Sequence, residues 1–235
     1  MGLSRRVGEA LRTALVTRVE RDHSQPDHEF RRRRVVVALV LVVGAVLLAV
    51  SLAVEPGDPS FYPLTMLVAL TWVLGGVVSG PLHLGHIPVR GTLRRPVLTP
   101  VLLGLLAGVV FGAGALVVRQ VPPLAGYVDD VLAHANEGYL PLIAAVTLVN
   151  GVAEEVFFRG GLFAAIGRRR PVLISTLVYA VATVATGNPM LVFAALVLGV
   201  LLGLQRRASG GILGPVLTHV TWSSAMLYLL PPLFA

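Results

Sequence analysis

The feature that most constrains this chain is a series of seven apolar runs, each close to the length that crosses a bilayer. They cover approximately residues 35–54, 63–80, 97–118, 139–164, 171–187, 190–204 and 211–234. A helical crossing takes roughly 20 residues, so these runs occupy most of the 235-residue chain. A separate soluble catalytic domain is therefore excluded. We expect an all-α, polytopic membrane helix bundle with about seven transmembrane helices, in contact with the lipid bilayer.

The basic residues predict how this bundle is threaded. All 19 are arginine. Alternate crossings place nearly all of them on one side of the membrane, in residues 1–34, 83–96, 166–170 and 205–210. Because such segments stay in the cytoplasm, we expect an integral plasma (inner) membrane protein of a bacterium, with its N-terminus cytoplasmic and its C-terminus outside. We interpret the net charge of +7 as a consequence of this membrane orientation, and therefore expect no nucleic-acid partner.

Three parts of the chain are expected. Residues 1–34 form a cytoplasmic Arg-rich tail, whose apolar residues at helical spacing favour an amphipathic helix on the lipid surface. A solvated, partly disordered tail is the alternative. Residues 35–138 hold transmembrane helices 1 to 3 and a long outside loop, and residues 139–235 form a transmembrane core.

The residues that carry chemistry lie in the fourth run. Cysteine is absent, which excludes disulfides, thiolate nucleophiles and Cys-ligated zinc. The segment Asn150-Gly-Val-Ala-Glu154-Glu155-Val-Phe-Phe-Arg159 places three charges inside an apolar run. Each charge costs about 2.5 to 3.5 kcal/mol at the centre of a membrane helix. A cluster of three therefore indicates a function, with a buried structural cluster or an ion path as the alternatives.

The two adjacent glutamates are expected to take different roles. Glu155 and Arg159 are four residues apart with the acid first, which favours an ion pair on one helix face. Glu154 is rotated by about 100° from Glu155 and has no cation on its own face. A carboxyl group in a dry setting can exchange a proton near neutral pH, as a general base must. His219 in the last run falls at a similar depth, so we expect it to meet Glu154.

These motifs resemble the CPBP group of intramembrane proteases, which includes CAAX-processing endopeptidases and bacteriocin-processing or self-immunity (Abi-type) proteins. The resemblance covers about residues 139–230. It rests on Glu154-Glu155-x-x-x-Arg159-Gly160, on Gly199-x-x-x-Gly203, and on Gly211-Ile-Leu-Gly-Pro-x-Leu-x-His219. The resemblance implies that a glutamate-activated water hydrolyses a peptide bond within the membrane. Glu154 would then be the base, supported by Glu155 and Arg159, with His219 as one of the family's two histidines.

Two positions depart from the family pattern. The second motif has an aromatic residue followed four positions later by His, and this chain has Tyr179 and Thr183 there. The Asn of the third motif falls on Ser223. Threonine cannot bind zinc as imidazole does or carry a proton near neutral pH. Ser223 would serve as a weaker donor to an oxyanion.

These departures leave two hypotheses. A catalytic zinc site usually has three protein ligands, and only Glu154 and His219 are offered here, so we expect no cofactor and do not favour zinc. The first hypothesis is a glutamate-dependent endopeptidase that cleaves a membrane-embedded peptide. The second is a catalytically impaired pseudoprotease that binds a membrane protein partner, as a scaffold or a subunit of a larger complex. The changes at Thr183 and Ser223 favour the second hypothesis.

Overall fold

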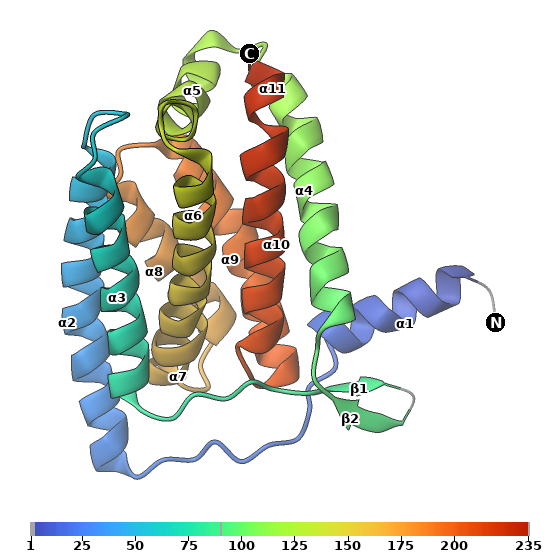
Figure 1. The fold of residues 1–235 in the computed structure, drawn as a ribbon. Coiled ribbons are helices and arrows are strands. Elements are labelled where there is room, and N and C mark those ends of the chain that lie inside the picture. The colour runs from blue at the N-terminus through green and yellow to red at the C-terminus, as the bar shows by residue number, and fades with distance from the viewer. Residues whose placement is uncertain (1–2, 90, 235) are drawn as a thin grey trace.

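The computed structural model describes residues 3–89 and 91–234, and most of these residues are in helices (Figure 1). Seven long elements of the described chain run side by side. They are α2 (Asp27–Leu52), α3 (Phe61–Ser79), α4 (Leu98–Val118), α6 (Leu140–Glu155) continued by the π-helix η1 (Val156–Leu162) and α7 (Phe163–Ile166), α8 (Pro171–Val184), α9 (Pro189–Ser209) and α10 (Leu213–Leu229). Each corresponds to one predicted apolar run. The predicted all-α membrane helix bundle is therefore confirmed.

Five of these elements are long and apolar enough to cross a membrane. They are α2, α3, α4, α9 and the continuous stretch Leu140–Ile166. The remaining two are shorter, with 14 residues in α8 and 17 in α10. The α2 helix begins at Asp27, before the predicted start at residue 35, because the arginine run 31–34 continues the same helix.

Helix ends follow local chemistry. Proline stands in the first turn of α6, α8 and α9, where its missing N–H removes no helical hydrogen bond. The Asn188 side chain caps α9 by accepting hydrogen bonds from the N–H groups of Met190 and Leu191. Gly210 ends α9 in the left-handed conformation, with φ of 75°.

Packing places α6 in the middle of the bundle. Helix α2 packs on α3, α8 on α9, and α4 on α10, while α6 contacts both α3 and α10. Small residues allow some of these contacts to be close. A Cβ atom added at Gly104 of α4 would lie 2.7 Å from the backbone oxygen of Thr218 in α10, and one at Gly199 would lie 2.7 Å from Thr176 in α8. Close backbone approach at glycine is typical of membrane helices.

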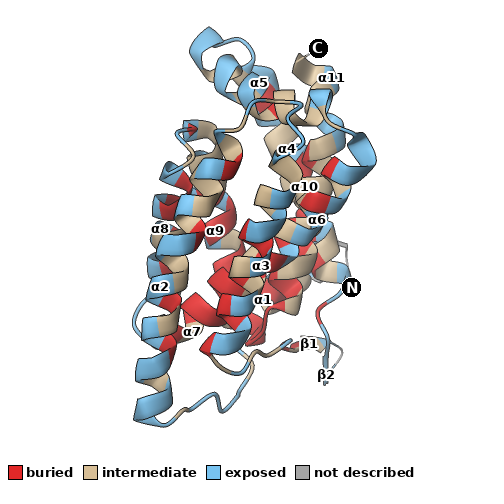
Figure 2. Ribbon diagram, turned by 60° about the vertical axis from the view of Figure 1, so that its left-hand side comes forward, coloured by how far each residue is buried: buried red, intermediate tan, exposed pale blue. Residues whose placement is uncertain are grey.

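Many exposed positions of the helices are apolar and several polar side chains are buried, as expected of an integral membrane protein. Figure 2 shows buried residues gathered inside the bundle and exposed residues on its outer faces. Many Val and Leu side chains of α2, α3, α4, α8 and α9 are exposed, which suits contact with lipid tails. The apolar core lies between α2, α3, α6 to α7 and α8, with Trp72 and Phe157 among its fully buried side chains. Buried polar residues include Glu155, Arg159 and His219.

The two ends of the bundle differ. One end holds α1 (Leu3–Leu15), the antiparallel hairpin of β1 (Ile87–Val89) and β2 (Thr92–Arg94), and the links that follow α7 and α9 (Figure 1). The four Arg-bearing segments predicted to share one side of the membrane all lie there, and we call this the Arg-rich end. Helix α1 packs on α9 and α4, with Ala14 buried, so this part of the tail is a helix held against the bundle.

The opposite end carries α5 (Pro122–Glu137) and the short C-terminal helix α11 (Pro231–Phe234). Helix α5 occupies the long loop predicted between the third and fourth crossings. His134 of α5 holds this helix to the α2–α3 link, because its Nε2 lies 3.0 Å from the Val54 carbonyl oxygen. Its ring also packs against Phe61.

Candidate active site

The predicted chemical segment lies where α6 changes into a π-helix. Glu155 is the last residue of α6 and is fully buried, and the seven-residue π-helix η1 starts at Val156. Such wide turns are uncommon and often occur at functional sites. Tight packing accompanies this one, because a Cβ atom added at Gly76 of α3 would lie 2.7 Å from the Val156 carbonyl oxygen.

Glu155 belongs to a buried cluster of three charged or ionisable groups. Its Oε1 atom accepts a hydrogen bond from the Arg159 guanidinium at 2.8 Å, which is the ion pair predicted from the four-residue spacing. His219 of α10 also reaches this oxygen, with Nδ1 at 2.8 Å. The other carboxylate oxygen, Oε2, has no protein partner among the described residues. Glu155 therefore joins α6, η1 and α10 inside the bundle.

Glu154 faces a different helix. The hydroxyl of Tyr179 in α8 donates a hydrogen bond to its Oε2 at 2.5 Å. Glu154 is half-buried. Among the described residues, Glu155 is the acid in both ion pairs, so Glu154 takes part in neither. The Arg159 guanidinium lies 4.9 Å from the centre of the Tyr179 ring, a cation–π distance. Tyr179 thus contacts Glu154 through its hydroxyl and Arg159 through its ring.

This arrangement corrects one geometric prediction. We expected His219 to meet Glu154, but its ring hydrogen-bonds Glu155. The rotation of about 100° between adjacent helical residues directs the two carboxylates to different neighbours, Glu155 to α10 and Glu154 to α8. His219 stays within the same polar cluster, because Arg159 contacts both Glu155 and the Tyr179 ring.

The two positions that depart from the family pattern have different surroundings. Thr183 is buried, and its hydroxyl donates to the backbone oxygen of Tyr179 one turn earlier at 2.9 Å. Its hydrogen is therefore used within its own helix. Ser223 lies one turn beyond His219 on α10 and is half-buried. Asn150, one turn before Glu154, likewise donates to its own helix, at the Val146 oxygen.

The donor set does not fit a catalytic zinc ion. Within residues 3–89 and 91–234, no three His, Cys, Asp or Glu side chains are grouped to hold a metal. The imidazole of His219 and the carboxylates of Glu154 and Glu155 are the ligand types present, and one Glu155 oxygen is already shared between Arg159 and His219. Zinc in hydrolytic sites generally has three protein ligands and an open position.

Sequence reasoning missed two contributors to the site. The motif marks Tyr179 only as an aromatic position, and nothing in the sequence indicates that its hydroxyl reaches Glu154 on another helix. The charge pattern marks Arg206 of α9 only as a topological signal, yet its Nε donates to the Arg159 backbone oxygen at 2.7 Å. Nothing in the sequence indicates that an arginine near the end of α9 contacts the π-helix.

Comparison with known proteins identifies the C-terminal part of the chain. Residues 136–225 match the family described as type II CAAX prenyl endopeptidase Rce1-like. The match confirms the predicted resemblance to CPBP intramembrane proteases and covers nearly the same residues. No curated protein and no solved structure matches the chain.

Proposed function

We propose that this chain is a member of the CPBP intramembrane protease family and an active glutamate-dependent endopeptidase that hydrolyses a peptide bond of a membrane-embedded substrate. The observation that carries the proposal is the unequal setting of the two glutamates. Glu155 is paired with Arg159 and His219, whereas Glu154 has a neutral hydroxyl as its hydrogen-bond partner. The second carboxylate oxygen of Glu154 is then the group that can take a proton from water.

The proposed chemistry uses Glu154 as base and then as acid. Its carboxylate removes a proton from water, whose oxygen attacks the peptide carbonyl carbon, and the carbonyl π bond breaks to give an oxyanion. The C–N bond then breaks as Glu154 returns the proton to the leaving nitrogen. Glu155 and Arg159 position the end of α6. Ser223 is a candidate hydrogen-bond donor to the oxyanion, and so is Nε2 of His219 when the ring is protonated, because Nδ1 of that ring already donates to Glu155.

The setting of this reaction belongs to the same proposal. We place the protein in the inner membrane with its Arg-rich end toward the cytoplasm, because arginine-bearing segments are retained there. Buried charge in a site surrounded by lipid-facing helices suits a substrate that reaches Glu154 from within the membrane. No step of the proposal uses a metal or another cofactor.

Comparison of membrane peptides in cells tests this function for any substrate of the enzyme. Cells lacking the protein would be complemented with wild type or with Glu154→Gln at equal abundance. New peptide C-termini and N-termini in the membrane fraction would then be quantified by mass spectrometry. We expect paired termini from one cleavage to appear with wild type and to be absent with Glu154→Gln. Identical profiles would contradict the proposal.

A specific observation supports the second candidate function, a pseudoprotease scaffold. The Thr183 hydroxyl donates within its own helix, so the position of the family's second histidine supplies no proton carrier. Native purification separates the two functions. A stoichiometric membrane partner that stays bound to Glu154→Gln, together with unchanged peptide profiles, would favour the scaffold. Loss of cleavage in Glu154→Gln with a monodisperse single protein would favour the enzyme.

A further inference from the structure

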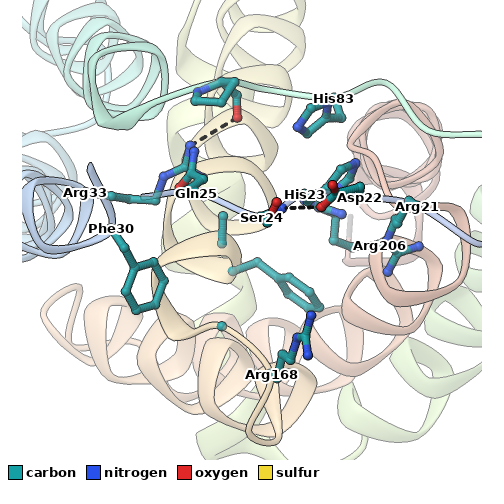
Figure 3. A pocket seen from close by; sticks show the side chains of 14 residues that line it. Arg21, Asp22, His23, Ser24, Gln25, Phe30, Arg33, His83, Arg168 and Arg206 are labelled. Carbon is teal, nitrogen blue, oxygen red and sulfur yellow. Dashed lines mark hydrogen bonds between the residues drawn. The ribbon is translucent and has the colours of Figure 1, made fainter. Parts of the chain in front are cut away.

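A pocket at the Arg-rich end contains neither glutamate of the candidate active site, and Arg206 is the residue that contacts both the pocket and that site. It has a volume of about 440 Å³ and lies between the tail, the start of α2, the 81–83 link, the α7–α8 link and the end of α9 (Figure 3). Arginines from four of these segments line it, namely Arg21, Arg33, Arg168 and Arg206. Segments that are far apart in sequence therefore bring their guanidinium groups to one cavity.

The pocket has an excess of positive charge. Asp22 is the carboxylate among its lining residues, and its Oδ1 accepts a hydrogen bond from the backbone N–H of Ser24 at 2.9 Å. Glu29 precedes Arg33 by four residues on α2. Within the described chain, however, neither acid is at ion-pair distance from an arginine of the pocket. Four cations facing one cavity repel one another unless an anion lies between them.

Two of these arginines are buried, so their charges are shielded from water. Arg33 is 2% exposed and Arg206 is 5% exposed. The Arg33 terminal nitrogen donates to the Pro81 carbonyl oxygen at 3.2 Å, while its buried Nε has no partner among the described residues. Arg206 donates from Nε to the Arg159 oxygen. Buried charges are normally paired, so these unpaired groups point to a missing anionic ligand.

Two stacked histidines complete the wall of the pocket. The rings of His23 and His83 are parallel within 9°, with centres 3.8 Å apart. Burial in the pocket, the neighbouring His83 ring and the cations Arg206 and Arg21 lower the pKa of His23 to about 4. The pKa of His83 is also lowered, mainly by burial and then by the charges of Arg206, Arg33 and Arg21. Both rings are therefore neutral at physiological pH and can each donate one N–H to an anion.

We propose that this pocket binds a phosphate group, supplied by an anionic phospholipid headgroup or by a soluble phosphate compound. Guanidinium groups match phosphate oxygens with paired N–H donors and remain charged when buried. Converging arginines from several segments suit a compact, multiply charged anion better than a single carboxylate. The cavity volume admits a phosphate together with part of a headgroup.

The bound phosphate would hold the tail on the bundle. Arg21 already donates to the backbone oxygens of Ala208 and Arg207 at the end of α9, and Val19 N–H donates to Ala208. A phosphate between Arg21, Arg168 and Arg206 would join the tail to α9 and the α7–α8 link. This site does not depend on the proposed peptide hydrolysis, because its residues do not include either glutamate.

Native mass spectrometry and thermal unfolding of the full chain test the proposal. The protein would be titrated with phosphatidylglycerol, with phosphatidylcholine and with inorganic phosphate. The test variant is R21Q/R168Q, which removes two exposed arginines of the pocket. The matched control is R94Q/R169Q, which removes two exposed arginines of the same end that do not line the pocket. Arg168→Gln alone is a second test variant, because it leaves the hydrogen bonds of Arg21 to α9 in place.

We expect wild type and the control to bind one phosphate-bearing ligand alike, and the R21Q/R168Q variant to bind it at least about tenfold more weakly, corresponding to about 1.4 kcal/mol. Binding of phosphatidylglycerol but not inorganic phosphate would assign the site to a lipid headgroup, and the reverse would assign it to a soluble phosphate. Equal binding by all four proteins, equal loss in the test variants and the control, or no binding of either ligand by wild type would overturn the proposal.

Discussion

The hydroxyl of Tyr179 donates to Oε2 of Glu154 at 2.5 Å, which joins α8 to the end of α6 beside the π-helix. The neighbouring Glu155 has a different environment, because Arg159 and His219 both contact its Oε1. Glu154 is thus held by a neutral donor, whereas the adjacent Glu155 is held by cationic or ionisable groups. Such a division of environments is how two carboxylates can take different chemical roles.

Tyr179→Phe tests the neutral partner of Glu154. The variant keeps the ring that packs on Phe158 and lies under Arg159, and it removes the hydroxyl. A hydrogen bond to a charged group contributes about 1.5 to 3 kcal/mol, so we expect the cleavage rate to fall by about tenfold to a hundredfold. The rate would be measured in proteoliposomes, with thermal unfolding as the control for folding. An unchanged rate would show that the hydroxyl does not position Glu154 for the reaction.

Glu155→Gln tests the buried ion cluster. The change leaves Arg159 buried without a counter-charge, and loss of one partner of such a pair costs about 3 to 5 kcal/mol. We expect a clear drop in the free energy of unfolding measured in detergent. Glu154→Gln is the matched control, because it removes the same charge one residue earlier without breaking an ion pair, and its effect should be smaller. Equal effects of the two substitutions would contradict the distinction between the glutamates.

Thr183→His tests whether the missing imidazole limits the reaction. A general acid or base contributes about 10²- to 10⁴-fold to a rate, so we expect the variant to cleave at least about tenfold faster than wild type. The larger side chain costs about 1 to 3 kcal/mol of stability in a packed site. Thr183→Gln, of similar size but without an imidazole, is the control. The same rate change in both variants would rule out imidazole chemistry.

The histidine pair predicts a dependence of tail docking on pH. The folded chain lowers the pKa of His23 from its ordinary 6.5 to about 4, so the unfolded or undocked tail binds the proton more readily. The stabilising contact is therefore fully present above about pH 6.5 and is lost as pH falls toward 4. Histidine NMR signals and hydrogen exchange of residues 19–26 would follow this change. A His23 titration midpoint near 6.5, with no loosening of the tail, would contradict the prediction.

Hydropathy and arginine placement were sufficient to predict the bundle. The runs of apolar residues predict the crossings, and positions such as Arg168 and Arg206 predict which links share an end, because both signals depend on local composition. The Glu155–Arg159 ion pair also follows from four-residue spacing within one helix.

Contacts between helices could not be predicted in the same way. Whether His219 contacts Glu154 or Glu155 depends on how α6 and α10 are rotated against each other, which depends on packing where they meet, as at Gly151 against Val220. The π-helix after Glu155, the hydroxyl of Tyr179 on Glu154 and the pocket around Arg33 all arise from that packing. No periodic pattern in the sequence records them.

The most direct test of the central claim is incorporation of oxygen from solvent into a newly formed peptide C-terminus. Purified wild type, Glu154→Gln and Arg169→Gln would be reconstituted with membrane extract from cells lacking the protein, in water enriched in ¹⁸O. We predict ¹⁸O-labelled carboxyl ends at the same peptides with wild type and Arg169→Gln, and none above background with Glu154→Gln. Equal labelling in all three samples, or none in any, would contradict the assignment of Glu154 as the base that activates water.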